Sequence, residues 1–494
     1  MFPYDWRYGV TGEYASGKTN ADLVKEKIDE VLQQTGADKV DVVAHSLGGL
    51  IVKEYAMDNP TDNHIGKAVF VGVPNTGAPK AVKALLQGDN FNIHFELFGQ
   101  TFGLSEAEIK KISENMPASY DLLPSQQYYN EKGSYVEVVN VQSPYTIISD
   151  NNLNYGESKS FLIQDYSLNS LAMANAEALH TQNFDNYDLR TAGIDVYAIN
   201  GCKAGTLGKI VEMRTKNVYG PDTVTYSTPK ETPGDGTVPL ESATNLPINQ
   251  NNKYYALVSD HGKMPSQNGI KQEIVNLISG SNLNVGSDLI TQDINQCQLN
   301  GKGFSVFSPI DIFITDQFGN QLGFADDGSV MNEIPNADFE VWGEPANSAD
   351  RHKFVYLPTD EGQTYNISLQ GTDTGTYTIK VDDIHNNQVI GGEVFESLPV
   401  TSDLTGAINL SSALGQTTLT AKEDKESQPE TIYPTKILTE EEAEDYLPPM
   451  AVITMRTSKE QCKKGGWKNF GTTFKNQGDC VSFVETKDKD KKKK

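Results

Sequence analysis

Two kinds of hydrophobic spacing alternate along the first part of the chain, and together they predict a succession of helices and strands. Val24, Ile28 and Val31 recur at the spacing of one helix face, so we expect a helix over residues 21–34, with Gly36 just past its end. The pattern then predicts strand 39–44, helix 47–57, strands 67–73, 194–199 and 254–258, and helix 270–278. Because strands and helices take turns, we expect an α/β fold with a mainly parallel sheet, in a domain over residues 1–283.

This alternation is interrupted between residues 89 and 189. Polar, aromatic-rich stretches and short amphipathic segments replace it there, with no regular succession of strands and helices. We interpret the segment as a cap inserted into the α/β domain.

Beyond residue 300 the hydrophobic spacing changes to two. Apolar and other side chains alternate over residues 310–314, and turns rich in Gly, Asn and Asp separate this run from similar ones. The pattern predicts a small all-β sandwich over residues 301–385. It fades over residues 386–456, which we expect to be a linker or a weakly structured region. Residues 457–494, a Cys/Gly/Trp motif followed by a Lys-rich tail, are expected to be poorly structured.

The charge of the chain narrows the choice of partners. Its 41 Lys and Arg stand against 66 Asp and Glu, a formal net charge of −25. This balance argues against nucleic acid, because binding phosphates requires clustered basic side chains. No apolar run approaches the roughly 18 residues that read as a membrane-spanning helix, so no transmembrane segment is expected. The N-terminus lacks the basic start and apolar stretch of a signal peptide, which leaves export open.

Four cysteines are too few for a disulfide framework and too scattered for a zinc site. Cys462 and Cys480 are candidates for a disulfide if the protein is exported. Cys202 and Cys297 are expected to be structural.

The first candidate for chemistry is Ser46, in the segment Ala44-His45-Ser46-Leu47-Gly48. The segment lies between a predicted buried strand and an immediate helix, which is the setting of a nucleophile elbow of the G-x-S-x-G type. Small flanking residues are required there because the strand and helix backbones pass close together, and Ala44 in place of the first glycine remains small. A serine that only caps the helix is the alternative interpretation.

A serine nucleophile needs a base and an acid that orients the base, and in this fold they follow in the order Ser, Asp or Glu, His. His261 is the candidate base, because it comes directly after the strand predicted at 254–258. Asp235 is the candidate acid, in the glycine-bracketed loop Gly234-Asp235-Gly236. Asp260 is a weaker candidate, since it adjoins the histidine in an extended loop. His45 should point away from the serine hydroxyl.

Four segments in order carry a family resemblance: residues 2–7 (Phe-Pro-Tyr-Asp-Trp-Arg), 44–49 (Ala-His-Ser-Leu-Gly-Gly), 72–77 (Gly-Val-Pro-Asn-Thr-Gly) and 234–239 (Gly-Asp-Gly-Thr-Val-Pro), followed by His261. Residues 1–280 thereby resemble the lecithin:cholesterol acyltransferase-like lipases of the α/β-hydrolase superfamily. The resemblance implies Ser46 as nucleophile, His261 as general base and Asp235 as its orienting acid. It implies that the backbone N–H of Leu47 donates to the oxyanion. It also implies lipid acyl esters as substrates, with no metal or cofactor.

The resemblance gives the insertion a role as well. The resembling lipases keep a lid over an acyl-binding groove at this place. Aromatic side chains of the insertion would either line such a groove or simply pack within the cap; they include Phe91, Phe95, Phe98, Phe102, Tyr128 and Tyr129.

One departure from the family concerns the oxyanion hole. The second donor comes from a loop upstream of the Tyr-Asp-Trp-Arg segment, and this sequence begins at that segment. We therefore expect an N-terminally truncated sequence whose parent is the active enzyme. Loss of one such donor costs about 10²- to 10³-fold in turnover.

These observations favour a serine esterase or lipase that forms an acyl-enzyme. An O-acyltransferase is the nearest alternative and differs only in whether an alcohol or water accepts the acyl group. A non-catalytic surface protein on a degenerate hydrolase scaffold is the rival from another class. We expect an extracellular or cell-surface location of bacterial type, with the sandwich as a site of contact to a cell surface or polymer.

Overall fold

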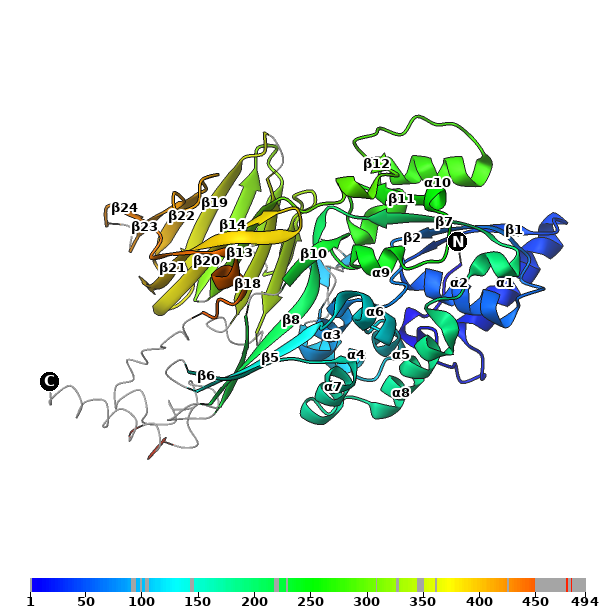
Figure 1. The fold of residues 1–494 in the computed structure, drawn as a ribbon, viewed down its shortest axis with the longest axis horizontal. Coiled ribbons are helices and arrows are strands. Elements are labelled where there is room, and N and C mark those ends of the chain that lie inside the picture. The colour runs from blue at the N-terminus through cyan, green and yellow to red at the C-terminus, as the bar shows by residue number, and fades with distance from the viewer. Residues whose placement is uncertain are drawn as a thin grey trace.

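The computed structural model divides into an α/β part and an all-β part that lie side by side (Figure 1). It describes residues 2–89, 95–97, 100–102, 106–142, 146–216, 222–227, 230–307, 309–325, 328–343, 351–359, 362–423, 426–448, 477–478 and 481. The predicted fold class, an α/β-hydrolase fold with an insertion and a following β-sandwich, is confirmed.

The central sheet of the α/β part has five strands in the order β1-β2-β7-β11-β12. Four run parallel, and the short last strand is antiparallel to β11. The strands are β1 (Val40–His45), β2 (Ile65–Val71), β7 (Asp195–Gly201), β11 (Lys253–Ala256) and β12 (Ile290–Thr291). Helices α1 (Asn20–Thr35), α2 (Leu47–Asp58), α3 (Pro79–Leu86), α9 (Leu240–Thr244) and α10 (Ile270–Ser279) accompany them.

The first helix shows how the sequence sets these elements. Thr19 and Asp22 form a capping box that satisfies free backbone N–H groups at the start of α1. Val24 and Ile28 on one face are buried, as their spacing predicts. The helix ends at Gly36, whose φ of 68° is a conformation that glycine adopts without strain.

The insertion consists of short helices and a β-hairpin that extends a second sheet. Its elements are β3 (Phe95–Leu97), β4 (Gln100–Phe102), α4 (Glu106–Ser113), α5 (Pro117–Asp121), α6 (Gln126–Lys132), β5 (Val136–Gln142), β6 (Thr146–Asn152), α7 (Tyr155–Ser160) and α8 (Ser170–Leu179). Strand β5 pairs in parallel with the long strand β8 (Ala204–Lys216), whose other partners are β9 (Thr223–Tyr226) and β10 (Lys230–Gly234).

Among the aromatic residues of the insertion, Tyr128 is buried and packs edge-on against Tyr135 in the core. Packing within the cap therefore accounts for this residue. Phe91 and Phe98 lie outside the described residues, as do the side chains of Phe95 and Phe102.

The all-β part is a sandwich of two antiparallel sheets. One has the order β17-β18-β13-β20-β21-β25 and the other β16-β15-β14-β19-β22-β23-β24. Their strands are β13 (Gly301–Phe307), β14 (Ile310–Asp316), β15 (Gln321–Phe324), β16 (Val330–Asn332), β17 (Asp338–Trp342), β18 (His352–Pro358), β19 (Tyr365–Gly371), β20 (Gly375–His385), β21 (Gln388–Val400), β22 (Thr405–Asn409), β23 (Thr418–Lys422), β24 (Glu430–Ile432) and β25 (Lys436–Leu438). Apolar side chains of both sheets form the core between them.

The expected boundary of the sandwich at residue 385 needs correction. Five strands, from β21 to β25, and the short helix α11 (Glu440–Glu444) lie within residues 386–456, which were expected to be a linker or weakly structured. In β21, Gly391, Gly392 and Pro399 interrupt the apolar alternation, so the local pattern is weak. Pairing with the neighbouring strand β20 holds this strand in the sheet instead.

A disulfide joins Cys202, just after β7, to Cys297, just before the sandwich. Both residues are buried, which agrees with the structural role expected of them. Cys462 and Cys480, the pair that the sequence offered as a candidate disulfide, lie outside the described residues. Within the described part of the chain, no helix is long and apolar enough to cross a membrane.

Candidate active site

Ser46 occupies the turn between β1 and α2. Its φ of 53° and ψ of −133° are a strained conformation for a residue with a side chain, as a nucleophile elbow requires. The backbone N–H of Ser46 donates to the carbonyl oxygen of Val71 at the end of β2, 3.0 Å away, which ties the turn to the sheet. A Cβ on Gly49 would lie 2.3 Å from Cγ2 of Val73, so the close packing of the helix leaves no room for a larger residue.

The structure brings Ser46 and His261 together although 215 residues separate them. His261 begins a 3₁₀ helix (His261–Ser266) a few residues after β11. Its Nε2 atom lies 2.9 Å from Oγ of Ser46. Its Nδ1 atom lies 2.8 Å from Oδ2 of Asp235. The serine hydroxyl and the carboxylate thus contact opposite nitrogens of one imidazole.

Asp235 is almost fully buried, at 2% exposed, in the loop that follows β10. Its Oδ1 atom accepts hydrogen bonds from the backbone N–H groups of Thr237 (3.0 Å) and Val238 (2.7 Å). Oδ2 therefore remains for the imidazole of His261. The backbone N–H of His261 also donates to the carbonyl oxygen of Asp235, at 3.1 Å. Asp260, the weaker candidate acid, is exposed to solvent in part and pairs instead with Lys263.

Gly72 packs against the side chains of Asp235 and His261. A Cβ at this position would be 2.9 Å from Oδ2 of Asp235 and 3.4 Å from Nδ1 of His261. Its φ of 55° also favours glycine. This is a physical reason for the first glycine of the Gly-Val-Pro-Asn-Thr-Gly motif.

The backbone N–H of Leu47, the donor that the family resemblance implies for an oxyanion, lies at the first turn of α2. Leu47 is the first residue of α2, so its N–H has no acceptor within the helix. The positive end of the helix dipole lies at the same place and favours negative charge.

His45 is a residue whose contacts the sequence did not reveal. Its ring packs on that of His261, with ring centroids 4.8 Å apart, and its Nε2 atom lies 2.8 Å from the backbone carbonyl oxygen of His261. Because a carbonyl oxygen only accepts, Nε2 of His45 must carry the hydrogen. Burial, and then the neighbouring His261, lower the pKa of His45 to about 4, so the ring is neutral at pH 7.

A second cluster of serine, histidine and aspartate lies in the insertion, but its order differs. The carboxylate of Asp185 lies between Ser125 Oγ (2.6 Å) and His180 Nδ1 (2.5 Å), so the histidine does not contact the serine. The other nitrogen of His180 faces the carbonyl oxygen of Asp121. Burial opposes the charged imidazole, yet the hydrogen bond and charge of Asp185 raise the pKa of His180. Both ring nitrogens of His180 face acceptor oxygens, so neither is free to take a proton from a serine.

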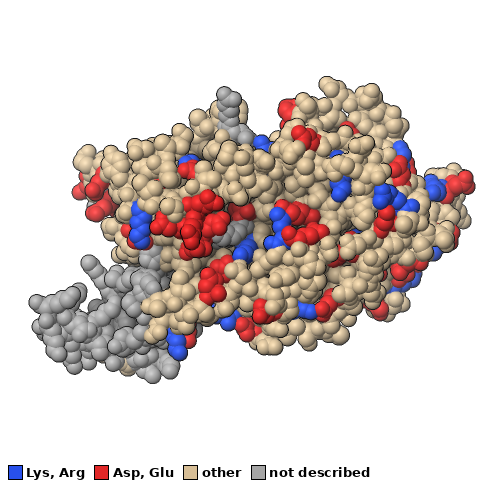
Figure 2. All heavy atoms as spheres, in the orientation of Figure 1, with Lys and Arg blue, Asp and Glu red and all other residues tan. Residues whose placement is uncertain are grey.

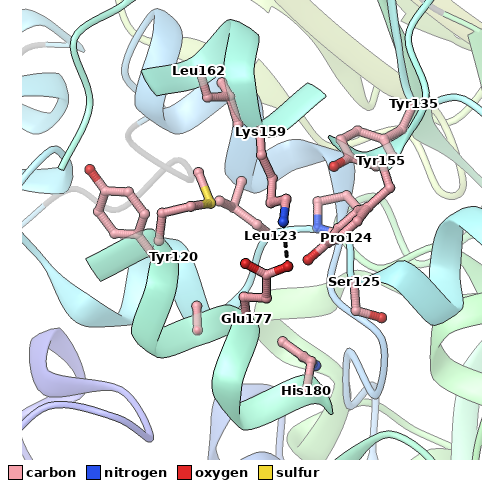
Figure 3. A pocket seen from close by; sticks show the side chains of 12 residues that line it. Tyr120, Leu123, Pro124, Ser125, Tyr135, Tyr155, Lys159, Leu162, Glu177 and His180 are labelled. Atoms are coloured by element: carbon pink, nitrogen blue, oxygen red, sulfur yellow. Dashed lines mark hydrogen bonds and ion pairs between the residues drawn. The ribbon is translucent and has the colours of Figure 1, made fainter. Parts of the chain in front are cut away.

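Two hollows lie apart from Ser46. One is lined by insertion residues and holds the ion pair of Lys159 with Glu177, close to His180 (Figure 3). The other has a volume of about 710 Å³, and Tyr166 and Glu212 are among its lining residues. Neither is lined by the residues around the elbow. Within the described residues, no cluster of three or more His, Cys, Asp or Glu side chains is placed to hold a metal ion.

Comparison with known families adds to this geometry. Residues 1–227 match the family model described as lecithin:cholesterol acyltransferase. The Arabidopsis thaliana protein "Phospholipase A(1) LCAT3" is 22% identical over 247 residues, which are 44% of this chain and 53% of the plant protein. The chain thus spans about half the length of that relative.

Two solved structures are also similar in part. The crystal structure of the Tle4–Tli4 complex covers 46% of this chain and 57% of its own, at 15% identity and a TM-score of 0.28. Bacillus licheniformis lipase BlEst2 in its propeptide form covers 85% of this chain and 83% of its own, at 12% identity and a TM-score of 0.26. These scores are too low to add to the assignment. The family match and the plant relative thus show that residues 1–227 of this chain are similar to the lecithin:cholesterol acyltransferase family.

Proposed function

We propose that this chain is a serine hydrolase that cleaves carboxylic esters of lipids. The observation that carries the proposal is the chain of hydrogen bonds from Ser46 through His261 to Asp235, with the serine in a strained turn at the start of a helix. In this interpretation Ser46 is the nucleophile, His261 the general base and Asp235 the residue that orients the base.

The reaction follows from these contacts. Oγ of Ser46 bonds to the acyl carbon while its proton passes to Nε2 of His261, and the backbone N–H of Leu47 donates to the oxyanion that forms. The ester bond then breaks, and His261 gives the proton to the departing alcohol. Water next attacks the acyl-enzyme and passes a proton to His261. Ser46 regains that proton as the carboxylic acid leaves.

The family match supports lipid acyl esters as the substrate class. It also favours a second candidate, transfer of the acyl group to an alcohol, because the matching family is described as an acyltransferase. The two reactions share every step up to the acyl-enzyme and differ only in the acceptor.

We further propose that the protein works outside the reducing cytoplasm. The disulfide between Cys202 and Cys297 supports this location, because such bonds form and persist mainly in oxidising compartments. Contact of the sandwich with a cell surface or polymer stays a proposal as well.

Labelling with a fluorophosphonate tests the proposed nucleophile. The reagent should modify Ser46 in the wild-type chain, as mapped by mass spectrometry, and labelling should disappear in Ser46→Ala. Ser125→Ala is the matched control, because this serine also belongs to a serine, histidine and aspartate cluster. Its replacement should leave labelling at Ser46 intact. A folded wild-type protein that resists the reagent would contradict the proposal.

The reaction products distinguish hydrolysis from acyl transfer. Incubation with a phospholipid, with and without an added long-chain alcohol, should release free fatty acid if water is the acceptor. A new ester of the added alcohol at the expense of the fatty acid would favour acyl transfer instead.

A further inference from the structure

The segment that carries His261 is held by a residue of the β-sandwich. Residues 257–260 connect the end of β11 to His261, and the backbone N–H of Leu257 donates to the carbonyl oxygen of Leu289 at 2.9 Å. Asn336 contacts this segment from the turn between β16 and β17: its Nδ2 donates to the carbonyl oxygen of Leu257 at 2.8 Å, and its Oδ1 accepts from the backbone N–H of Ser259 at 3.3 Å.

Only a side-chain amide of this length suits the position. A carboxylate could accept from Ser259 but not donate to Leu257, and an apolar side chain could do neither. Asn336 is only 9% exposed, so water replaces these hydrogen bonds poorly. Its φ of 62° is a conformation that asparagine tolerates better than most residues.

The turn that contains Asn336 is itself fixed to the α/β part. The carbonyl oxygen of Asn336 accepts a hydrogen bond from the backbone N–H of Gly205 in β8, at 3.3 Å. A Cβ on Gly205 would lie 2.7 Å from the ring of Tyr356 in strand β18, so the sandwich packs tightly against β8 at this point. The turn that carries Asn336 is thus bonded to β8, while its side-chain amide contacts Leu257 and Ser259.

A second contact from the sandwich reaches the loop of Asp235. Glu340, in β17, is 1% exposed and pairs with Lys80 of α3, whose Nζ lies 3.0 Å from Oε1. The same Nζ donates to the carbonyl oxygen of Gly236 at 3.1 Å, one residue after Asp235. The carboxylate of Glu340 thereby holds the ammonium group of Lys80, which in turn binds the loop 234–239 that contains Asp235, here called the acid loop.

Both loops meet over Gly201, the last residue of β7. A Cβ there would lie 2.5 Å from Cβ of Asp235 and 2.5 Å from Oγ of Ser259. Asp235 and Ser259 therefore pack against the same glycine, so a displacement of one loop changes the packing of the other. Asn336 and Glu340 lie only four positions apart in the sandwich. One short piece of the β-domain thus contacts the segment of His261 directly and the loop of Asp235 through Lys80. On the surface seen in Figure 2, acidic side chains lie on both sides of the border between the two parts.

We propose that residues 336–340 of the sandwich position His261 and Asp235, so that the β-domain is part of the active-site scaffold and not only a tether. Asn336 acts as a positioning residue for residues 257–262, here called the base loop because they contain His261. Glu340 acts through Lys80 on the acid loop. The inference rests on the proposed function, since positioning matters for catalysis only if Ser46 is the nucleophile. Misplacement of a reacting group by about 1 Å can cost about 10²-fold in rate.

Asn336→Gly tests the base loop, because glycine keeps the positive φ and removes both side-chain hydrogen bonds. Asn386→Gly is the matched control: Asn386 lies in the same domain at a φ of 50°, in the turn between β20 and β21. Its backbone N–H donates to Asn300, and among the described residues its side chain forms no hydrogen bond with either loop. Each variant is measured by hydrogen exchange of the peptides that cover 257–262 and 234–239, by thermal melting and by the rate of fluorophosphonate labelling.

In Asn336→Gly we expect faster exchange confined to the peptide over 257–262. The labelling rate and kcat on a small ester should fall by about 10- to 100-fold with KM nearly unchanged. Asn386→Gly should match the wild type. Unchanged exchange and unchanged labelling in Asn336→Gly would overturn the proposal. A drop in melting temperature with loss of protection throughout the chain would also overturn it, because the contact would then serve stability alone.

Glu340→Gln provides a second, independent measurement on the acid loop. It removes one charge from a side chain of nearly the same shape, and the exchange of the peptide over 234–239 should increase. No increase there would overturn this half of the proposal. If the wild type is not labelled at Ser46, the proposed function fails, while the exchange data still decide whether the sandwich positions the two loops.

Discussion

Nε2 of His45 lies 2.8 Å from the backbone carbonyl oxygen of His261, so the residue before the serine holds the histidine that faces the serine. The two rings also pack on each other. We therefore infer that His45 positions His261, the proposed base. Its own hydrogen bond requires a neutral ring, which the lowered pKa of about 4 provides.

Replacement of His45 tests this contact. In His45→Ala we expect the rate of labelling at Ser46 to fall by about 10-fold or more, because the base loop loses one of its supports. His45→Gln should recover much of the rate, since its amide N–H can donate to the same carbonyl oxygen. Equal labelling rates in the wild type and in His45→Ala would contradict this role. If the labelling rate falls as much in His45→Gln as in His45→Ala, the packing of the two rings matters and the hydrogen bond does not.

The low pKa of His45 also predicts a dependence of stability on pH. In the unfolded chain the imidazole gains a proton near pH 6.5, whereas in the folded chain it does so only near pH 4. The contribution of the neutral ring is therefore complete above about pH 6.5 and is lost as the pH falls through 4. Urea unfolding at pH 7 and pH 5 should show a smaller decrease in the free energy of unfolding for His45→Gln than for the wild type. An equal decrease in both would contradict the assignment.

Gly72→Ala should disturb the two residues above it. The added methyl group would lie 2.9 Å from Oδ2 of Asp235, so the carboxylate must move. We expect a fall in labelling of about 10²-fold. Gly36→Ala is the control for backbone strain alone: it too has a positive φ, of 68°, but a Cβ there meets no atom within 4 Å. It should cost about 1 kcal/mol of stability and leave labelling unchanged. Equal labelling in the two variants would rule out the steric explanation.

The sequence allowed prediction of the three residues that the structure brings together because each follows the end of a strand in a recognisable order. Ser46 follows a valine-rich strand, Asp235 lies between two glycines, and His261 comes after the last parallel strand. These signals are local. The contacts of His45 and Asn336 are not, because they depend on how segments 216 and 77 to 79 residues away cross them.

The same distinction explains the misplaced end of the sandwich. Alternating isoleucines in β14 give a clear local pattern, and this strand was predicted. Strand β21 contains two adjacent glycines and a proline, so its local pattern is poor and only pairing with β20 reveals it. Likewise, nothing in the spacing of the cysteines indicates that Cys202 pairs with Cys297, because the pairing follows from the path of the chain between the two domains.

The disulfide should stabilise the folded chain substantially. It closes a loop of 95 residues, and loops of this length restrict the unfolded chain strongly. The double variant Cys202→Ser and Cys297→Ser should lose about 2–4 kcal/mol in the free energy of unfolding, as measured in urea. Reduction of the wild type should give a similar loss, while the reductant should not change the double variant. A wild type whose unfolding is the same with and without reductant would contradict this expectation.

The border between the two domains should become less stable as the pH rises. Asp338 is buried, and burial together with the charge of Glu340 raises its pKa to about 7, although Lys80 and Lys83 oppose this shift. The pKa of Glu231 is raised as well, by burial and by the charge of Asp338. Among the described residues, Oδ2 of Asp338 has no hydrogen-bond partner. The charged groups that face Asp338 include two lysines, Lys80 and Lys83, and three acids, Asp89, Glu231 and Glu340. The two lysines therefore do not fully compensate a negative charge on Asp338.

The direction of this pH dependence follows from the number of protons bound by the folded and the unfolded chain. Between about pH 4 and pH 7 the folded chain keeps the proton of Asp338 and the unfolded chain does not, so stability falls as the pH rises through this range. Asp338→Asn carries no such proton. It should be more stable than the wild type at pH 8, by on the order of 1 kcal/mol, and should show a smaller decrease from pH 5 to pH 8. Asp403→Asn, at an exposed position of the same domain, is the control and should follow the wild type. If Asp338→Asn and the wild type lose the same stability over this range, the carboxyl of Asp338 is already charged in the folded protein and the lysines of α3 compensate it.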